Sequence, residues 1–197
     1  MTGRMLAFML ASLTLIAIPG PNMIFIVTRS ATHGLRAGIA SAFGVETGTL
    51  LQLTLVGAGL ATLVAASPLA FAIIKYAGVG YLAYIGFRAL HSARKGAAAV
   101  EAAPARQRRR LFLDGVLVSA LNPKVALFFL AFLPQFVRSE GELPAFGAVF
   151  IALGLAADIA SCFAANAIGR WLRVRSGGSR VVGSIYLGLG LFTAVSA

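Results

Sequence analysis

Two short breaks in otherwise apolar stretches carry the residues whose types and spacing could bind a charged solute. The first break is Pro19-Gly20-Pro21-Asn22 and the second is Asn122-Pro123-Lys124. Proline removes a backbone donor and prevents a helix from continuing, so amides and carbonyls lose their partners at each break. Asparagine can donate and accept hydrogen bonds, and the start of a new helix favours anions. The breaks therefore indicate a binding site for a carboxylate at Pro19, Gly20, Pro21, Asn22, Asn122, Pro123 and Lys124.

Glu46 and Asp158 are the acidic residues that lie deepest in apolar surroundings. A carboxyl group that moves between dry and wet settings can take up and release a proton, so each is a candidate for proton or ion coupling. Each could instead form an ion pair with Lys124 or with Lys75 and serve the structure alone. Lys75, Gln52 and Asn166 are secondary candidates for the polar lining of a site. Asp114, near the end of an apolar stretch, is expected to be solvated.

The composition determines which kind of element must position these residues. Of the 197 residues, 59% are hydrophobic and only 12% are charged, whereas a soluble domain carries roughly 25% charged residues. A helix needs about 20 apolar residues to cross a bilayer, and the apolar runs here reach that length. Backbone groups in lipid must be satisfied within the segment, so the runs are expected to be helices. We predict a multi-pass, all-α membrane protein.

Six membrane-spanning helices follow from the apolar runs. Their approximate bounds are Met5–Thr28, Ala37–Ala66, Pro68–Ala89, Leu111–Val137, Leu143–Gly169 and Val181–Ser196. The proline breaks fall inside the first and the fourth. In the second, Gly44-x-x-x-Gly48 has the spacing that lets two helices approach closely.

The basic residues determine the expected orientation. The net charge is +11, and most Lys and Arg residues lie in the links 29–36, 88–110 and 170–180, which should face the cytoplasm. Both termini would then be external. A five-span chain with a re-entrant first segment is the competing topology. The same rule explains the positive charge without a nucleic-acid partner. Arg108-Arg109-Arg110 anchors this topology and could also contact anionic lipids.

The two halves of the chain correspond to each other. Three spans on each side of a cytoplasmic link give opposite orientations, which is the arrangement of an inverted repeat of three plus three helices, about 1–95 and 106–197. Pro21 aligns with Pro123 and Glu46 with Asp158. Tyr76-Ala77-Gly78-Val79-Gly80 is matched by Tyr186-Leu187-Gly188-Leu189-Gly190. Corresponding broken helices are typical of transporters with a site at the membrane midplane, so residues 1–197 are read as one transporter domain.

The sequence lacks the motifs for metal binding, ATP hydrolysis and disulfide formation. His33 and His91 lie in or beside links, and no His, Cys, Asp and Glu residues cluster at metal-ligand spacing. There is no Walker-type phosphate loop, so ATP hydrolysis is not expected. The single cysteine, Cys162, rules out an internal disulfide. We expect no enzyme activity, no cofactor and no metal site, with energy drawn from an ion gradient or from the substrate gradient.

The motifs resemble those of the lysine exporter and homoserine/threonine resistance (LysE/RhtB) family. They are Pro19-Gly20-Pro21-Asn22, His33-Gly34-Leu35-Arg36-Ala37-Gly38, Gly44 to Gly48, Lys75-x-x-Gly78-x-x-Tyr81-Leu82, Asn122-Pro123-Lys124, Pro134-Gln135-Phe136 and Asp158. The resemblance covers nearly the whole chain. It implies a bacterial inner-membrane exporter of amino acids or close derivatives, driven by the proton motive force. It also implies six helices and a homo-oligomer.

Two functional hypotheses from different classes follow. In the first, the chain exports a zwitterionic amino acid, whose carboxylate meets Asn22, Asn122, Lys124 and the half-helix ends. Its amine, or a coupled proton, meets Glu46 or Asp158. In the second, the chain is a cation or metal-ion transporter of the same fold. That alternative needs several acidic or soft ligands to converge within the membrane.

Overall fold

The computed structural model describes residues 2–60 and 105–172, together with positions 67, 69, 72–73, 76–77, 79–81, 83–84 and 87. Within these residues the chain is helical and contains no strand. The helices are α1 (Thr2–Ala17), α2 (Pro21–His33), α3 (Leu35–Leu55), α6 (Ala105–Ala120), α7 (Pro123–Ala131), α8 (Leu133–Phe136) and α9 (Leu143–Leu172). A π-helical turn, Val56–Leu60, extends α3, and a 3-10 turn, Glu140–Glu142, precedes α9.

Both predicted proline breaks are present in the structure. The chain bends by 56° between Thr2–Ala17 and Pro21–His33, and by 46° between Gln107–Ala120 and Pro123–Phe136. Pro21 and Pro123 each begin a new helix, the position where the missing amide hydrogen is least costly. By length and composition, Leu35–Ala58 and Leu143–Ala167 could each cross a membrane. Each bent pair could form one further span, which gives two to four spans in the described residues.

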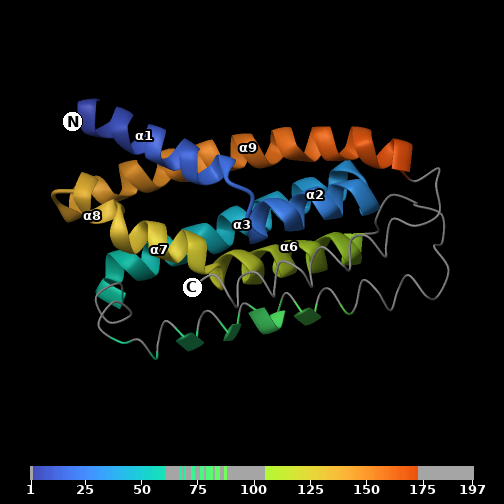
Figure 1. The fold of residues 1–197 in the computed structure, drawn as a ribbon, viewed down its shortest axis with the longest axis horizontal. Coiled ribbons are helices and arrows are strands. Elements are labelled where there is room, and N and C mark those ends of the chain that lie inside the picture. The colour runs from blue at the N-terminus through green and yellow to red at the C-terminus, as the bar shows by residue number, and fades with distance from the viewer. Residues whose placement is uncertain are drawn as a thin grey trace.

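The helices run roughly along one axis of the molecule. Figure 1 shows the N-terminus and α8 at one end, and the end of α2, the start of α6 and the end of α9 at the other. The first helix, α1, lies along the first part of α9, and α3 packs between α6 and α9. The protein therefore has two recognisable ends, with both helix breaks between them.

Glycines bring α3 and α6 into close contact. A Cβ atom on Gly48 would lie 2.5 Å from the carbonyl oxygen of Val116, and one on Gly115 would lie 2.6 Å from that of Ser41. A Cβ on Gly44 would likewise collide with the backbone of Phe112. Close approach of this kind is how helices associate in membranes, where no hydrophobic force acts between them. The predicted packing role of Gly44 and Gly48 is confirmed.

Two larger apolar clusters hold the described helices together. The first surrounds Phe25, Ile26 and Val45, and joins α2, α3, α6 and α9. The second surrounds Phe8 of α1, whose ring meets the ring edges of Phe136 and Phe146 at centroid distances of 5.4 and 5.1 Å. The first half-helix therefore depends on aromatic packing against the second half of the chain.

Several predicted boundaries are corrected by the structure. The helix α6 begins at Ala105, so Arg106 to Arg110 form its first turns and do not belong to the linker 88–110. Arginine and glutamine favour helix, which lets the helix continue beyond the apolar run that marked its start. The fourth predicted span has a second interruption at Phe132, just before Pro134 in α8. The first span begins at Thr2 and its second part continues to His33.

The complete repeat remains a prediction. The sixth predicted span and Tyr186-Leu187-Gly188-Leu189-Gly190 lie outside the described residues, as does most of Pro68–Ala89. Six helices in a three-plus-three arrangement are therefore neither confirmed nor contradicted.

Candidate functional site

The two helix breaks meet through their asparagines. The Asn122 side chain donates from Nδ2 to Oδ1 of Asn22 at 2.8 Å, and Nδ2 of Asn22 donates to Oγ of Ser119 at 3.2 Å. The Ser119 hydroxyl in turn pairs with that of Thr49 on α3 at 2.9 Å. The bonded residues are 70 to 100 positions apart in the chain, so the fold brings the two proline motifs into one polar network.

The carbonyls freed at each break are satisfied by long side chains from elsewhere. The Lys124 ammonium donates to the carbonyl oxygens of Leu15, at 2.7 Å, and Ile18, at the end of α1. The Gln52 amide donates to the carbonyl oxygens of Ala120 and Asn122, at 3.1 and 3.2 Å, at the end of α6. A cation at a helix C-terminus also complements the helix dipole. Lys124 therefore contacts neither of the two deep acids in this structure.

The helix starts at the two breaks differ in how they are capped. At the start of α7, the Asn122 side chain accepts a hydrogen bond from the Lys124 amide at 3.0 Å. At the start of α2, the capping position is Gly20, which has no side chain, and no side-chain hydrogen bond caps the helix. The first amides of α2 remain available to an anion, whereas α7 already has an internal acceptor.

Glu46 on α3 and Asp158 on α9 line the same cavity, and we refer to them as the carboxyl pair. Each is 8% exposed. Gly154, one turn before Asp158, leaves space for Glu46 against α9, because a Cβ there would lie 2.6 Å from Oε1 of Glu46. Within the described residues, Oε2 of Glu46 and Oδ2 of Asp158 are buried and accept no hydrogen bond. The pair can therefore accept bonds from a bound donor.

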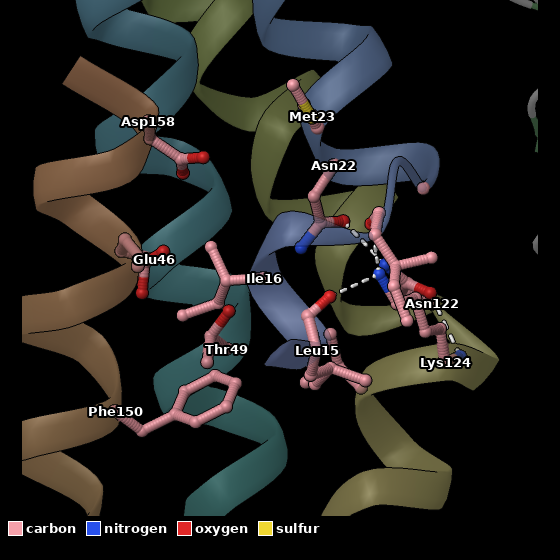
Figure 2. Close-up of a pocket in the computed structure, with 14 residues that line it drawn as sticks. Leu15, Ile16, Asn22, Met23, Glu46, Thr49, Asn122, Lys124, Phe150 and Asp158 are labelled. Atoms are coloured by element: carbon pink, nitrogen blue, oxygen red, sulfur yellow. Dashed lines mark hydrogen bonds between the residues drawn. The ribbon is translucent and has the colours of Figure 1, made fainter. Parts of the chain in front are cut away.

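A cavity of about 60 Å³ connects these features. Figure 2 shows Asp158 and Glu46 on one side of it and Asn22, Asn122 and Lys124 on the other, with Leu15 and Ile16 of α1 between them. One water molecule needs roughly 10–15 Å³ by this measure, so the cavity has room for a small solute and not for a peptide. The lining residues are Leu15, Ile16, Ile18, Gly20, Asn22, Met23, Glu46, Thr49, Asn122, Lys124, Val125, Phe150, Gly154 and Asp158.

Six of the twelve candidate site residues line this cavity. Gly20, Asn22, Asn122, Lys124, Glu46 and Asp158 all do. Pro19, Pro21 and Pro123 lie at the helix ends and do not line the cavity. Gln52 is not in the lining either, and bonds to the end of α6. Asn166, farther along α9, is not part of the lining, and Lys75 lies outside the described residues.

Some residues of the site carried no sequence signal: Thr49 and Gly154 line the cavity, and Ser119 bonds to Thr49. Thr49 and Ser119 are common helix residues whose hydroxyls normally bond to their own backbone, so nothing marked them as part of a network. Gly154 resembles any small residue in a membrane helix. The i, i+4 spacing of Gly154 and Asp158 places them on one helix face, which is the signal that could have identified the glycine.

Two further charged contacts lie away from the cavity. Near the N-terminus, the Arg4 guanidinium makes a two-pronged contact with Glu142, with bonds of 2.9 and 2.8 Å. Within α6, Asp114 accepts a hydrogen bond from Tyr81 at 3.0 Å and lies 3.9 Å from Arg29 of α2. The expectation that Asp114 is simply solvated is wrong, because its side chain is only 13% exposed.

Sequence comparison places the chain in a known group. Residues 13–197 match the model of a family described as LysE type translocator. The chain belongs to this family. The match covers most of the sequence, including both breaks and both deep acids, so the family resemblance expected from the motifs is confirmed.

Three relatives illustrate the range of this LysE family. A homoserine/homoserine lactone efflux protein of Salmonella typhimurium is 38% identical over 68% of this chain, and the match spans 65% of that protein's length. An uncharacterized membrane protein of Pseudomonas aeruginosa is 30% identical, over 96% of this chain and 94% of its own. A leucine efflux protein of Salmonella choleraesuis is 28% identical, over 92% and 90%. No solved structure matches the chain.

In the described part of this LysE family member, no group of three or more His, Cys, Asp or Glu side chains could hold a metal ion. The cation-carrier alternative therefore gains no support from these residues. What the cavity does offer is a pair of carboxyl groups, an uncapped helix start and an apolar wall.

Proposed function

We propose that this LysE family member exports a neutral amino acid, or a close derivative, from the cytoplasm in exchange for protons. Two relatives are named for the efflux of homoserine or its lactone and of leucine, all of which carry a single amine and no charged side chain. The observation that carries the proposal is that one small cavity presents an uncapped helix start and a buried carboxyl pair. Those groups complement the two charges of an amino acid.

The substrate carboxylate binds at the start of α2. The amides there have no side-chain acceptor. The Lys124 side chain lies beside Gly20, with Nζ 3.4 Å from the place of a Cβ atom. Asn22 and Asn122 border the same place and can add amide hydrogens. Lys124 supplies positive charge nearby, while its ammonium holds the end of α1. Of the contacts expected from the sequence, the proposal gives the main one to the start of α2, and Asn22, Asn122 and Lys124 support it.

The substrate ammonium binds at Glu46 and Asp158. Both carboxyl groups are buried and line one small cavity, so we infer that they hold a proton between them when no cation is bound. An arriving ammonium favours release of that proton. If the substrate leaves on one side of the membrane and the proton is taken up there, the two fluxes are coupled in opposite directions.

The substrate side chain faces an apolar wall. Leu15, Ile16 and Ile18 from α1, with Val125 and Phe150 opposite, line the cavity and carry no charge. A basic side chain would need a second carboxylate there, and an acidic one a second cation. The wall therefore favours aliphatic or small uncharged side chains over those of lysine, arginine or glutamate.

The localisation and membrane topology of the protein can be inferred from its charge pattern and its family. We infer a multi-pass protein of the bacterial inner membrane, with the basic stretch 88–110, which includes the first turns of α6, in the cytoplasm, both termini outside and a homo-oligomeric assembly. Arg108, Arg109 and Arg110 at the start of α6 contact anionic lipid headgroups. The described helices alone provide two to four spans of suitable length.

Everted membrane vesicles test the proposal directly. Labelled neutral, basic and acidic amino acids are offered to vesicles with and without an acidic interior. We expect a neutral amino acid to accumulate only with the gradient, and Glu46→Gln to abolish the gradient-driven part. Lipid-facing Leu13→Ala serves as the matched control, since that side chain is 44% exposed. Equal accumulation after collapse of the gradient would refute proton exchange, and accumulation of no amino acid would refute the substrate class.

A further inference from the structure

The structure assigns Arg4 a role in transport that nothing in the family match provides. We propose that Arg4 is a positioning residue which, through its pair with Glu142, latches α1 as a movable wall over the cavity. This inference rests on the proposed export function, and it concerns how the site opens. It depends on four features of α1, each independent of which amino acid is carried.

The first feature is that α1 forms one wall of the cavity. Leu15, Ile16 and Ile18 are the lining residues from this helix, and all three lie in its last turn or just beyond it. In Figure 2, Leu15 and Ile16 lie between the carboxyl pair and the asparagines. Displacement of this helix end would therefore open the cavity directly.

The second feature is the hinge. The chain between α1 and α2 contains Pro19 and Gly20, and the two helices are inclined by 56°. The backbone hydrogen bonding of α1 does not continue into α2 through Pro19, Gly20 and Pro21. A helix joined to its neighbour by such a break can tilt without unwinding either helix.

The third feature is the way α1 packs. It lies mainly against α9 and α8, whereas α2, α3, α6 and α9 pack against one another through buried residues and close glycine contacts. Leu6 and Leu10 on its outer face are 58% and 67% exposed, as lipid-facing residues are. Because lipid tails are as apolar as the aromatic cluster around Phe8, partial withdrawal into lipid does not incur the cost that it would in water.

The fourth feature is that charged side chains hold both ends of α1. Lys124 holds its C-terminal carbonyls, and Arg4 near its N-terminus reaches both oxygens of Glu142 and also the carbonyl oxygen of Phe136, at the end of α8. Arg4 and Glu142 are 138 residues apart in the chain. Their side chains are 23% and 19% exposed, so water can replace the contact when the latch opens.

These four features together distinguish a latch from an ordinary surface ion pair. The pair ties the N-terminal end of a hinged half-helix to the turn before α9, which belongs to the other half of the chain. The charge pattern predicts that this end is external, so the latch closes the cavity toward the outside. Transport then requires Arg4 and Glu142 to separate in every cycle.

Thiol labelling of the purified protein in nanodiscs tests the latch without any substrate. In a Cys162→Ala background, Val125→Cys provides a reporter in the cavity, where the valine is 7% exposed. We expect Arg4→Gln and Glu142→Gln each to increase its rate of maleimide labelling roughly two- to fivefold, the factor that loss of a partly exposed ion pair represents. The charge-swapped double variant, Arg4→Glu with Glu142→Arg, should restore slow labelling.

Two controls separate gating from loosening of the whole fold. Val45→Cys reports on the other core cluster, where the valine is 1% exposed, and its labelling should not change. Arg138→Gln removes a neighbouring cation whose contact with Glu142 comes only from its backbone amide, and should leave the Val125→Cys rate unaltered. Unchanged labelling in both Gln variants, or equal acceleration at Val45→Cys, would overturn the latch.

A covalent lock provides the second, functional readout. Arg4→Cys with Glu142→Cys, joined by a bifunctional thiol reagent, should stop net transport, and reductive cleavage of the linker should restore it. Full transport by the locked protein would contradict the proposal. Labelling needs no substrate, so the two proposals can fail separately. If the latch is wrong, vesicle accumulation and its gradient dependence are unaffected. If the substrate class is wrong, the labelling pattern is unaffected.

Discussion

The Asn122 side chain donates a 2.8 Å hydrogen bond to the side-chain oxygen of Asn22, and so joins the two broken helices at the point where each restarts. The same Asn122 side chain also accepts from the Lys124 amide and caps α7. One residue thus ends a helix, starts another and bridges the two halves of the chain. The two breaks therefore form one structural unit, which lines one side of the cavity.

The two roles of Asn122 can be separated by substitution. Asn122→Ser keeps an oxygen able to cap α7 but is too short to reach Asn22, whereas Asn122→Ala loses both contacts. We expect Asn122→Ala to lower the free energy of unfolding by about 1–2 kcal/mol, and Asn122→Ser to lower it by less. Transport should fall in both. Thermal unfolding in detergent and vesicle transport measure the two effects, and equal stability of the two variants would argue against the cap.

The Lys124 ammonium donates to the carbonyl oxygens of Leu15 and Ile18, so we expect it to stabilise the end of α1. Lys124→Met keeps the length and apolar stem of the side chain but leaves the carbonyls of Leu15 and Ile18 without the ammonium. We predict a loss of about 1–3 kcal/mol of stability, together with faster labelling of the Val125→Cys reporter. Lys124→Arg should retain most of the stability. If Lys124→Met exported amino acids at the wild-type rate, both its structural and its electrostatic roles in transport would be excluded.

Gly154 matters because it leaves space for the Glu46 carboxyl. In Gly154→Ala, the new methyl group would lie 2.6 Å from Oε1 of Glu46, so the flexible end of the glutamate must move away from Asp158. We expect slower gradient-driven transport with a nearly unchanged melting temperature. Gly141→Ala is the matched control, because nothing lies within 4 Å of that position. A Gly154→Ala protein with unaltered transport would show that the spacing of the carboxyl pair is unimportant.

The Arg4–Glu142 pair should be insensitive to physiological changes in pH. The hydrogen bonds from Arg4 and from the Arg138 amide lower the pKa of Glu142 from 4.5 to about 2. A lowered pKa means that the stabilisation is fully present above pH 4.5 and is lost as the pH falls toward 2. Melting temperatures of wild type and Glu142→Gln should therefore differ by a constant amount from pH 5 to 8 and converge in acid. A difference that varies between pH 5 and 8 would contradict this assignment.

The sequence predicted the local features well and the long-range ones poorly. Proline disrupts the interior of a helix, so Pro19, Pro21 and Pro123 allowed both breaks to be located from the sequence alone. Charged or amide groups such as Glu46, Asp158 and Asn22 are expensive in lipid, which made them recognisable as candidates, and all three line the cavity. These predictions depend on chemistry that acts within one helix turn.

What could not be predicted depends on which distant segments meet. The pairing of Arg4 with Glu142, and that of Lys124 with the end of α1, join residues more than 100 positions apart. The uncapped start of α2 could be distinguished from the capped start of α7 only once the direction of the Asn122 side chain was visible. For the same reason Asp114 was expected to be solvated, whereas Tyr81 and Arg29 surround it.

The most direct test of a substrate site between the two breaks is counterflow in proteoliposomes without a proton gradient. The amino acid identified in vesicles is exchanged by wild type, by Asn22→Ala and by the lipid-facing control Leu13→Ala. We predict wild-type exchange by Leu13→Ala and at least a roughly tenfold loss by Asn22→Ala, as removal of about 1.4 kcal/mol of binding would give. Exchange at the wild-type rate by a correctly folded Asn22→Ala protein would contradict a site at the junction of the helix breaks.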